Sequence, residues 1–158
     1  MATRTDNNEN ATKSAEGGRS FGLQRIYLKD VSFESPLAPA VFQGEWKPTL
    51  NVNIGTRARA LEGDLHEIVL TVTVEAKQDD KVAFLVELQQ AGIFLISGFS
   101  AEERQQVAAI LCPQNLFPFA REEIASLTVK GGFPQILLQP INFERIYQQG
   151  NQPSKGKA

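Results

Sequence analysis

Three consecutive segments of this chain alternate between apolar and polar residues, and this period of two constrains the fold more than any other feature. They are LNVNIGTRARA at 50–60, the segment 68–74 with a branched aliphatic residue at every second position, and KVAFLVELQQAGIFLI at 81–96. Such alternation is typical of β-strands, whose successive side chains point to opposite faces of a sheet. Polar turns at 62–64 and 78–81 join the segments, so we expect an antiparallel meander.

A further extended segment, residues 21–34, precedes the meander and also alternates, with apolar residues on both of its faces. It is joined to the meander by SPLAPAVFQGEWKP at 35–48, where three prolines block both helix and β-ladder. This long connection also carries Phe42 and Trp46. A loop of this apolar character is expected to cover another apolar surface.

Helices are predicted after the meander. The sequence SAEE at 100–103 can form a capping box, and we expect the helix that begins there to be interrupted at Pro113. A second helix is predicted over about 117–130, where a pair of glycines follows its last residue. The segment 133–143 is expected to be extended because it holds two prolines, and Asn142 can cap a short helix after it.

Length and charge narrow the classes of protein that the chain can belong to. Its 158 residues, 42% of them hydrophobic, suit one domain, predicted at 21–149 between disordered polar tails at 1–20 and 150–158. The formal net charge of −2 argues against a nucleic-acid binder held by a basic surface. Neither a signal peptide nor an apolar run long enough to span a bilayer is apparent, so a cytoplasmic protein without direct membrane insertion is expected.

Catalytic and cofactor-binding patterns are not found in the sequence. His66 is the only histidine and Cys112 the only cysteine, which leaves no zinc-type cluster and no internal disulfide. His66 follows a turn and is interpreted as solvated, and Cys112 is interpreted as a packed structural thiol. Phosphate-binding glycine motifs are absent as well, so we predict neither an enzyme nor a cofactor. An enzyme with a ligand pocket near Trp46 is kept as an alternative.

Several stretches, taken together, resemble the SecB family of bacterial export chaperones over about residues 21–148. They are QRIYLKDVSFESPLAPAVF with EWKP, then FLVELQQAGIF, CPQNLFPFARE and GGFPQILLQPINF. The resemblance implies an α+β fold: a four-stranded antiparallel sheet with a long crossover loop after the first strand, helices packed on one face, and assembly as a dimer of dimers.

The resemblance also implies a function that needs no catalytic group. Members of the family are ATP-independent holdases that bind unfolded precursor proteins in long apolar grooves and deliver them to the SecA motor of the Sec export pathway. An alternative is a SecB-like holdase that serves another client, such as an unstable antitoxin, without contacting SecA.

Residues are carried over from the family for three surfaces. Asp30, Glu34, Leu85 and Glu87 align with the surface that meets a positively charged zinc-binding tail of SecA, and strand parity places each pair on one face of its strand. The opposite parity of the last strand corresponds to the junction between dimers. The predicted tetramer-interface residues are Val86, Leu88 and Gln90. The predicted client-groove residues are Phe42, Trp46, Leu116, Phe117, Phe119, Phe143 and Ile146.

The chain departs from the family in its charge. Family members are usually strongly acidic, whereas here the net charge is −2, and Arg57 and Arg59 are expected to point from the sheet toward solvent. The C-terminal sequence NQPSKGKA is short and basic. Like charges across an interface are unfavourable, so the arginines are expected to weaken attraction for a basic SecA tail.

Overall fold

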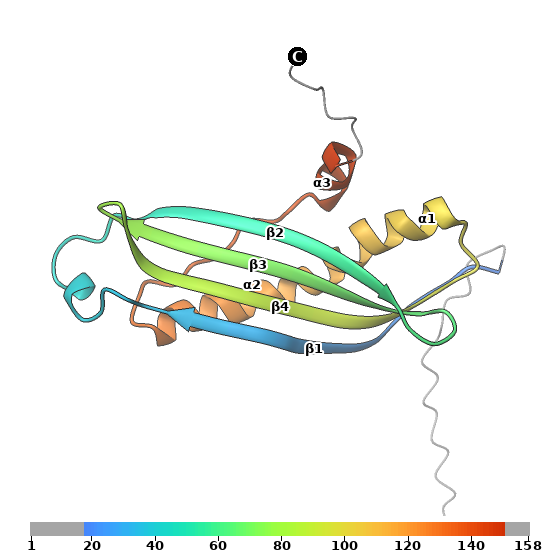
Figure 1. Cartoon of the computed structure of the whole chain (residues 1–158), viewed down its shortest axis with the longest axis horizontal. Helices are drawn as coiled ribbons and strands as arrows, with labels where there is room; N and C mark the ends of the chain where they lie inside the picture. The colour runs from blue at the N-terminus through green and yellow to red at the C-terminus, as the bar shows by residue number, and fades with distance from the viewer. Residues whose placement is uncertain (1–17, 151–158) are drawn as a thin grey trace, which may run out of the picture.

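The computed structural model describes residues 18–150, and its main element is a sheet of four long antiparallel strands (Figure 1). Their spatial order is β1-β4-β3-β2. The four-stranded antiparallel sheet is therefore confirmed, and β1 and β2 form its two edges. The strands are β1 (Ser20–Glu34), β2 (Thr49–Ala60), β3 (Leu65–Gln78) and β4 (Lys81–Ser97).

The turn between β3 and β4 consists of two residues, Asp79 and Asp80, with φ angles of 51° and 61°. Two consecutive positive φ angles match the right-handed twist of the flanking strands, and Asp tolerates this conformation better than most residues. The turn sets Gln78 opposite Lys81, and a register shift between Lys77 and Ala76 then leaves Ala83 of β4 without a partner residue.

The edge strand β1 contains two β-bulges, one between Leu23 and Arg25 and one between Leu28 and Asp30. Each bulge adds one residue, so the side chains after it change faces. The unbroken alternation predicted over 21–34 is therefore wrong. The bulges turn apolar residues from both predicted faces of β1 toward the helices.

The helical layer follows β4 and covers one face of the sheet. Its elements are α1 (Ala101–Gln106), a π-helical turn (Val107–Leu111), α2 (Cys112–Lys130) and, after an extended segment, α3 (Phe143–Gly150). The predicted capping box at Ser100 and Glu103 is present. Asn142 also caps α3, because its Oδ1 accepts a hydrogen bond from the backbone N–H of Arg145 at 3.0 Å.

The sequence predicts that the helix is interrupted at Pro113. In the structure the helix instead continues through this residue to Lys130. A proline lacks the N–H of the helical ladder and its ring collides with a carbonyl of the preceding turn. Here that preceding turn is the π-helical segment 107–111, whose extra residue widens the helix just before Pro113. The helix therefore passes through the proline with an irregular turn.

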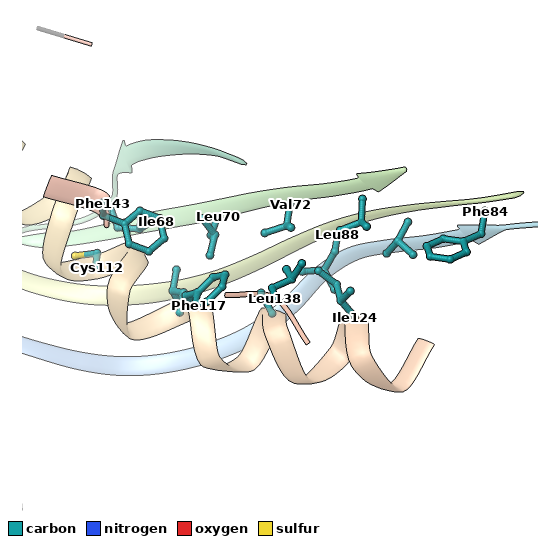
Figure 2. Close-up of a cluster of buried hydrophobic side chains, with 14 of the residues drawn as sticks. Ile68, Leu70, Val72, Phe84, Leu88, Cys112, Phe117, Ile124, Leu138 and Phe143 are labelled. Atoms are coloured by element: carbon teal, nitrogen blue, oxygen red, sulfur yellow. The ribbon is translucent and has the colours of Figure 1, made fainter. Parts of the chain in front are cut away.

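The core lies between α2 and strands β3 and β4, which α2 crosses (Figure 2). Every second residue of these strands points to α2, as the alternation predicts. None of the helices among residues 18–150 is both long and apolar enough to cross a membrane. The side chains labelled in Figure 2 are Ile68, Leu70, Val72, Phe84 and Leu88 from the strands, and Cys112, Phe117, Ile124, Leu138 and Phe143 from the helical layer.

Candidate functional site

An apolar groove lies beside the edge strand β2, beyond the area that α2 covers. Leu50 and Val52 point to the helical face of the sheet but remain 44% and 39% exposed. The extended segment between α2 and α3 runs along them and contributes Leu137, which is 55% exposed. The cavity has a volume of about 590 Å³. Its lining is Leu50, Val52, Asn53, Ile54, Ile136, Leu137, Leu138, Gln139, Pro140, Ile141 and Ile146.

A cluster of aromatic side chains lies where the crossover loop meets the end of α2. The buried ring of Phe133 is at its centre, with centroids 5.2 Å from Phe42, 5.1 Å from Trp46 and 4.8 Å from Phe84. Phe42 remains 49% exposed, and Trp46 is half-buried. The apolar loop therefore covers an apolar surface, as the sequence predicts, and leaves part of one ring accessible.

The residues predicted to line a client groove lie in five different places. Ile146 lines the groove beside β2, Phe42 and Trp46 belong to the aromatic cluster, and Phe119 is half-exposed on the outer side of α2. Phe117 and Phe143 are almost fully buried and border a separate hollow of about 240 Å³. The placement of Leu116 in a groove is wrong, because this side chain has no exposed surface and packs in the core.

The residues Leu50, Val52 and Leu137 were not predicted as groove residues. The alternation of β2 predicts that its apolar side chains face the core. They do point to the helical face of the sheet, but α2 leaves Leu50 and Val52 exposed there. The informative signal is topological: β2 is an edge strand, and α2 packs mainly on the two central strands β3 and β4.

An acidic area occupies one end of the open sheet face, opposite to the helices. The register sets Glu34 opposite Leu85 and Ser32 opposite Glu87. Asp30 lies on the same face, opposite Gln89. The structure therefore brings together the four residues predicted for SecA. Glu75, which the sequence pattern does not predict for this surface, pairs with Leu85 from the side of β3. We call Asp30, Glu34, Glu75 and Glu87 the acidic half.

The other end of the same face is basic. One row across the sheet contains Arg25, Ile93, Glu67 and Arg59 in register. Glu67 is buried, and its Oε1 lies 2.8 Å from Lys29 Nζ and 3.6 Å from Arg59 Nη2. The hydroxyl of Tyr27 donates a hydrogen bond to its other oxygen. We call Arg25, Lys29, Arg57 and Arg59 the basic half.

The hydrogen bonds to Glu67 change the pKa of both partners. Those from Lys29 and Tyr27 lower the pKa of the Glu67 carboxyl, against an opposing contribution from burial. Burial together with the Glu67 carboxylate raises the pKa of Tyr27 to about 12. At neutral pH, Glu67 is therefore a carboxylate and Tyr27 a neutral donor.

The Glu67 cluster makes stability dependent on pH in acid. Because the folded pKa of Glu67 lies below its ordinary value of 4.5, its contribution is complete above that value and is lost as pH falls through the folded pKa. We expect Glu67→Gln to lower the free energy of unfolding by roughly 1–3 kcal/mol at neutral pH. Urea unfolding should show that this difference shrinks below pH 4.5. The exposed turn variant Glu62→Gln is the control, and a difference for Glu67→Gln that stays constant into acid would contradict the assignment.

The predicted tetramer-interface residues lie inside the fold of the single chain. Val86 and Leu88 are buried in the core that α2 covers. Gln90 is also buried, and its Nε2 donates a hydrogen bond to the backbone oxygen of Tyr27 at 3.1 Å. Any influence of these residues on subunit assembly must therefore pass through α2. Their assignment to an interface stays a prediction.

The two residues considered for nucleophilic or metal chemistry have ordinary structural roles. Cys112 is buried, and burial raises the pKa of its thiol to about 12, so the thiol is protonated at neutral pH. His66 Nδ1 lies 3.1 Å from the backbone oxygen of Asp64. Among residues 18–150, no three potential metal-ligating side chains come together. The groove and the charged sheet face are therefore the features suited to function, and both are suited to binding.

Comparisons with known proteins agree with this description. A family model described as Preprotein translocase subunit SecB matches residues 14–154. The Protein-export protein SecB of Pseudomonas syringae is 48% identical over 142 residues, which cover 90% of this chain and 88% of that protein. The protein of the same name from Hahella chejuensis is 53% identical over 129 residues, covering 82% and 81% respectively.

A solved structure also has the same fold. It is a SecB-like chaperone of Mycobacterium tuberculosis in complex with a peptide from an antitoxin. The TM-score is 0.65 at 17% sequence identity, with 77% of this chain and 91% of that chain covered. At this identity, the likeness supports the fold alone.

Proposed function

Because the chain belongs to the SecB family, we propose that it is an ATP-independent export chaperone that holds unfolded precursor proteins and delivers them to SecA. The observation that carries this proposal is the groove beside β2, where apolar side chains stay exposed although they point to the helical face of the sheet. An export chaperone acts before translocation, so we place its action in the cytoplasm.

The groove suits an unfolded segment in two ways. Its apolar lining gains roughly 25 cal/mol for each Å² that a client removes from water, without selecting a particular sequence. The adjoining strand β2 is an edge of the sheet. An extended client can pair with such an edge through main-chain hydrogen bonds, which depend little on side chains. Several weak subsites along one client then add up through avidity.

Delivery to SecA is assigned to the acidic half of the open sheet face. This surface contains Asp30, Glu34 and Glu87, all exposed, with the partly exposed apolar residue Leu85 between them. A basic, partly apolar tail of SecA is complementary to it. The groove lies on the helical side of β2 and the acidic half on the opposite face, so a client and SecA can be bound at the same time.

Assembly as a dimer of dimers is proposed to use the outer side of α2. Phe119 and Val129 are 50% and 54% exposed there, and contact with another subunit would remove this apolar surface from water. Val86 and Leu88 pack in the core against α2 and would influence assembly through the position of this helix. The native mass of the protein tests this assignment, and a monomer at micromolar concentration would overturn it.

The proposed function is tested by refolding a precursor protein in the presence of an equal amount of this chain without nucleotide. Slower refolding and co-elution of the ternary complex with SecA are expected. Unchanged refolding would overturn the chaperone proposal. Binding of unfolded clients without SecA would instead favour a holdase for another client.

The groove itself is tested by Leu137→Asp. Leu137 is exposed, so the substitution leaves the core intact but places a charge in the apolar lining. We expect at least a roughly tenfold weaker affinity for an unfolded client, because a charged group is costly to desolvate. Leu111→Asp is the matched control, since Leu111 is 39% exposed but lies outside the groove, on the π-helical turn before α2. Equal losses in both variants would contradict the placement of the client site.

A further inference from the structure

The basic half is a built feature of the sheet rather than a scatter of surface charges. Arg25 and Arg59 occupy the same row as Glu67, on either side of it. Lys29 reaches the row from a bulge in β1, and its ammonium group is fixed at 2.8 Å from Glu67. Lys29, Arg57, Arg59 and Glu67 surround a hollow of about 370 Å³ on this face, together with Ala58 and Val69.

Positive charge remains in excess around this hollow. Glu67 is the single carboxylate in its lining, and it is already engaged by Tyr27, Lys29 and Arg59. Arg57 Nη2 donates only to the neutral amide oxygen of Gln89, at 3.3 Å. Within the described part of the chain, neither Arg25 nor Arg57 lies within ion-pair distance of a carboxylate.

We propose that the basic half binds an acidic peptide segment of a partner protein. The hollow would receive a carboxylate from the segment, with Arg57 and Arg59 as the groups that pair with it. Both arginines lie on the edge strand β2 and are exposed, so an approaching chain meets them first. Glu67 is a positioning residue, because it holds Lys29 and Arg59 beside the hollow.

The acidic half limits what kind of anion can bind. Glu87 and Ile93 are six positions apart on β4, and Ile93 lies opposite Glu67. At about 3.3 Å per residue, Glu87 is roughly 20 Å from the Glu67 row, or about two and a half Debye lengths at physiological ionic strength. The two halves meet at Gln89, which lies opposite Asp30 and accepts the hydrogen bond from Arg57. A nucleic acid or an anionic bilayer would extend over both halves and meet the carboxylates of the acidic half. A short peptide can place its acidic residues on the basic half alone.

The same geometry favours a segment with charges of both signs. An extended peptide of about six residues spans the roughly 20 Å between the Glu67 row and Glu87. A segment with an acidic stretch and then a basic stretch would pair with both. This second contact rests on the proposed role of the acidic half, whereas binding of an acidic peptide to the basic half does not.

The experiment measures fluorescence anisotropy with a fluorescein-labelled peptide of alternating glutamate and serine. The test variant carries Arg57→Gln and Arg59→Gln. The control variant carries Arg104→Gln and Lys130→Gln, which remove the same charge from the exposed helical side. We expect the test variant to bind roughly five- to tenfold more weakly than the wild type, and the control variant to bind within about twofold. Thermal unfolding and native mass verify that both variants fold and assemble normally.

Two results would overturn the proposal. One is equal affinity of the wild type and the test variant for the glutamate peptide. The other is equally tight, equally arginine-dependent binding of single-stranded DNA or of vesicles made from phosphatidylserine and phosphatidylcholine, which would indicate a general polyanion surface. A second peptide, with a lysine stretch about six residues after the glutamates, is expected to bind more tightly, and Glu87→Gln should remove only that gain. Absence of the gain would overturn the two-sign segment, while SecA co-elution tests the proposed function separately.

Discussion

Replacing Phe84 by alanine is expected to lower the free energy of unfolding by about 3–5 kcal/mol, the usual loss for a buried phenylalanine. Phe84 has no exposed surface, and its ring stacks on Phe33 and Trp46 at centroid distances of 5.8 and 6.3 Å. The ring of Phe133 contacts it at 4.8 Å. The substitution therefore leaves a cavity between β4 and the crossover loop. Urea unfolding measures the loss as a shift in midpoint at constant slope.

The control for this prediction is Phe42→Ala, the same change in the same aromatic cluster. Phe42 is 49% exposed, so we expect a loss of no more than about 1 kcal/mol. Similar losses in the two variants would contradict the structure, because they would mean that Phe42 is as deeply packed as Phe84. Comparing the two variants therefore distinguishes the buried part of the aromatic cluster from its exposed part.

The sheet could be predicted from sequence wherever a strand keeps its alternation from end to end. Strands β2 and β3 do so, as does β4 from Phe84 onward, and their turns contain residues that tolerate positive φ. The capping residues Ser100 and Asn142 were predicted for the same reason, since a cap depends on a local hydrogen bond. Local patterns of this kind are present in the sequence itself.

Features that depend on partners distant in the sequence could not be predicted in this way. The bulges in β1 are visible only in its register with β4. The helix continues past Pro113 because a π-helical turn relieves the clash, and no simple pattern marks such a turn. The apolar face of β2 was correctly predicted, but its exposure follows from its place at the edge of the sheet.

The candidate surfaces show the same division. The common face of Asp30 and Glu34 was predicted correctly, because both bulges precede Asp30. Glu75 was missed because it joins them only through the pairing of β3 with β4. For Leu88 the parity was right, but the immediate cover is α2 of the same chain. Parity predicts the face of a residue, and topology decides what covers it.

The largest expected effect on partner binding belongs to Glu87→Lys. Glu87 is exposed on the open face of β4 and lies between Ser32 on β1 and Thr73 on β3. Its side chain contributes nothing to the core, so the fold, the native mass and the holding of unfolded clients should stay unchanged. A lysine at this central position would oppose the positive charge of the SecA tail instead of attracting it. We expect the affinity for SecA to fall by more than about tenfold, and to fall further when Glu34→Lys is added.

The control for this effect is Glu62→Lys, which makes the same charge change in the turn between β2 and β3, at the other end of the sheet. If net charge alone governed the encounter with SecA, both variants would lose affinity equally. If the acidic half is the binding surface, only Glu87→Lys should lose it, and the salt dependence of binding should become weaker in that variant. Binding of Glu87→Lys at wild-type strength would place the SecA contact elsewhere.

Because Arg57 approaches the acidic half at Gln89, Arg57→Gln should strengthen SecA binding and weaken binding of the glutamate peptide. These opposite effects of one substitution would show that the two halves of the sheet face bind different partners.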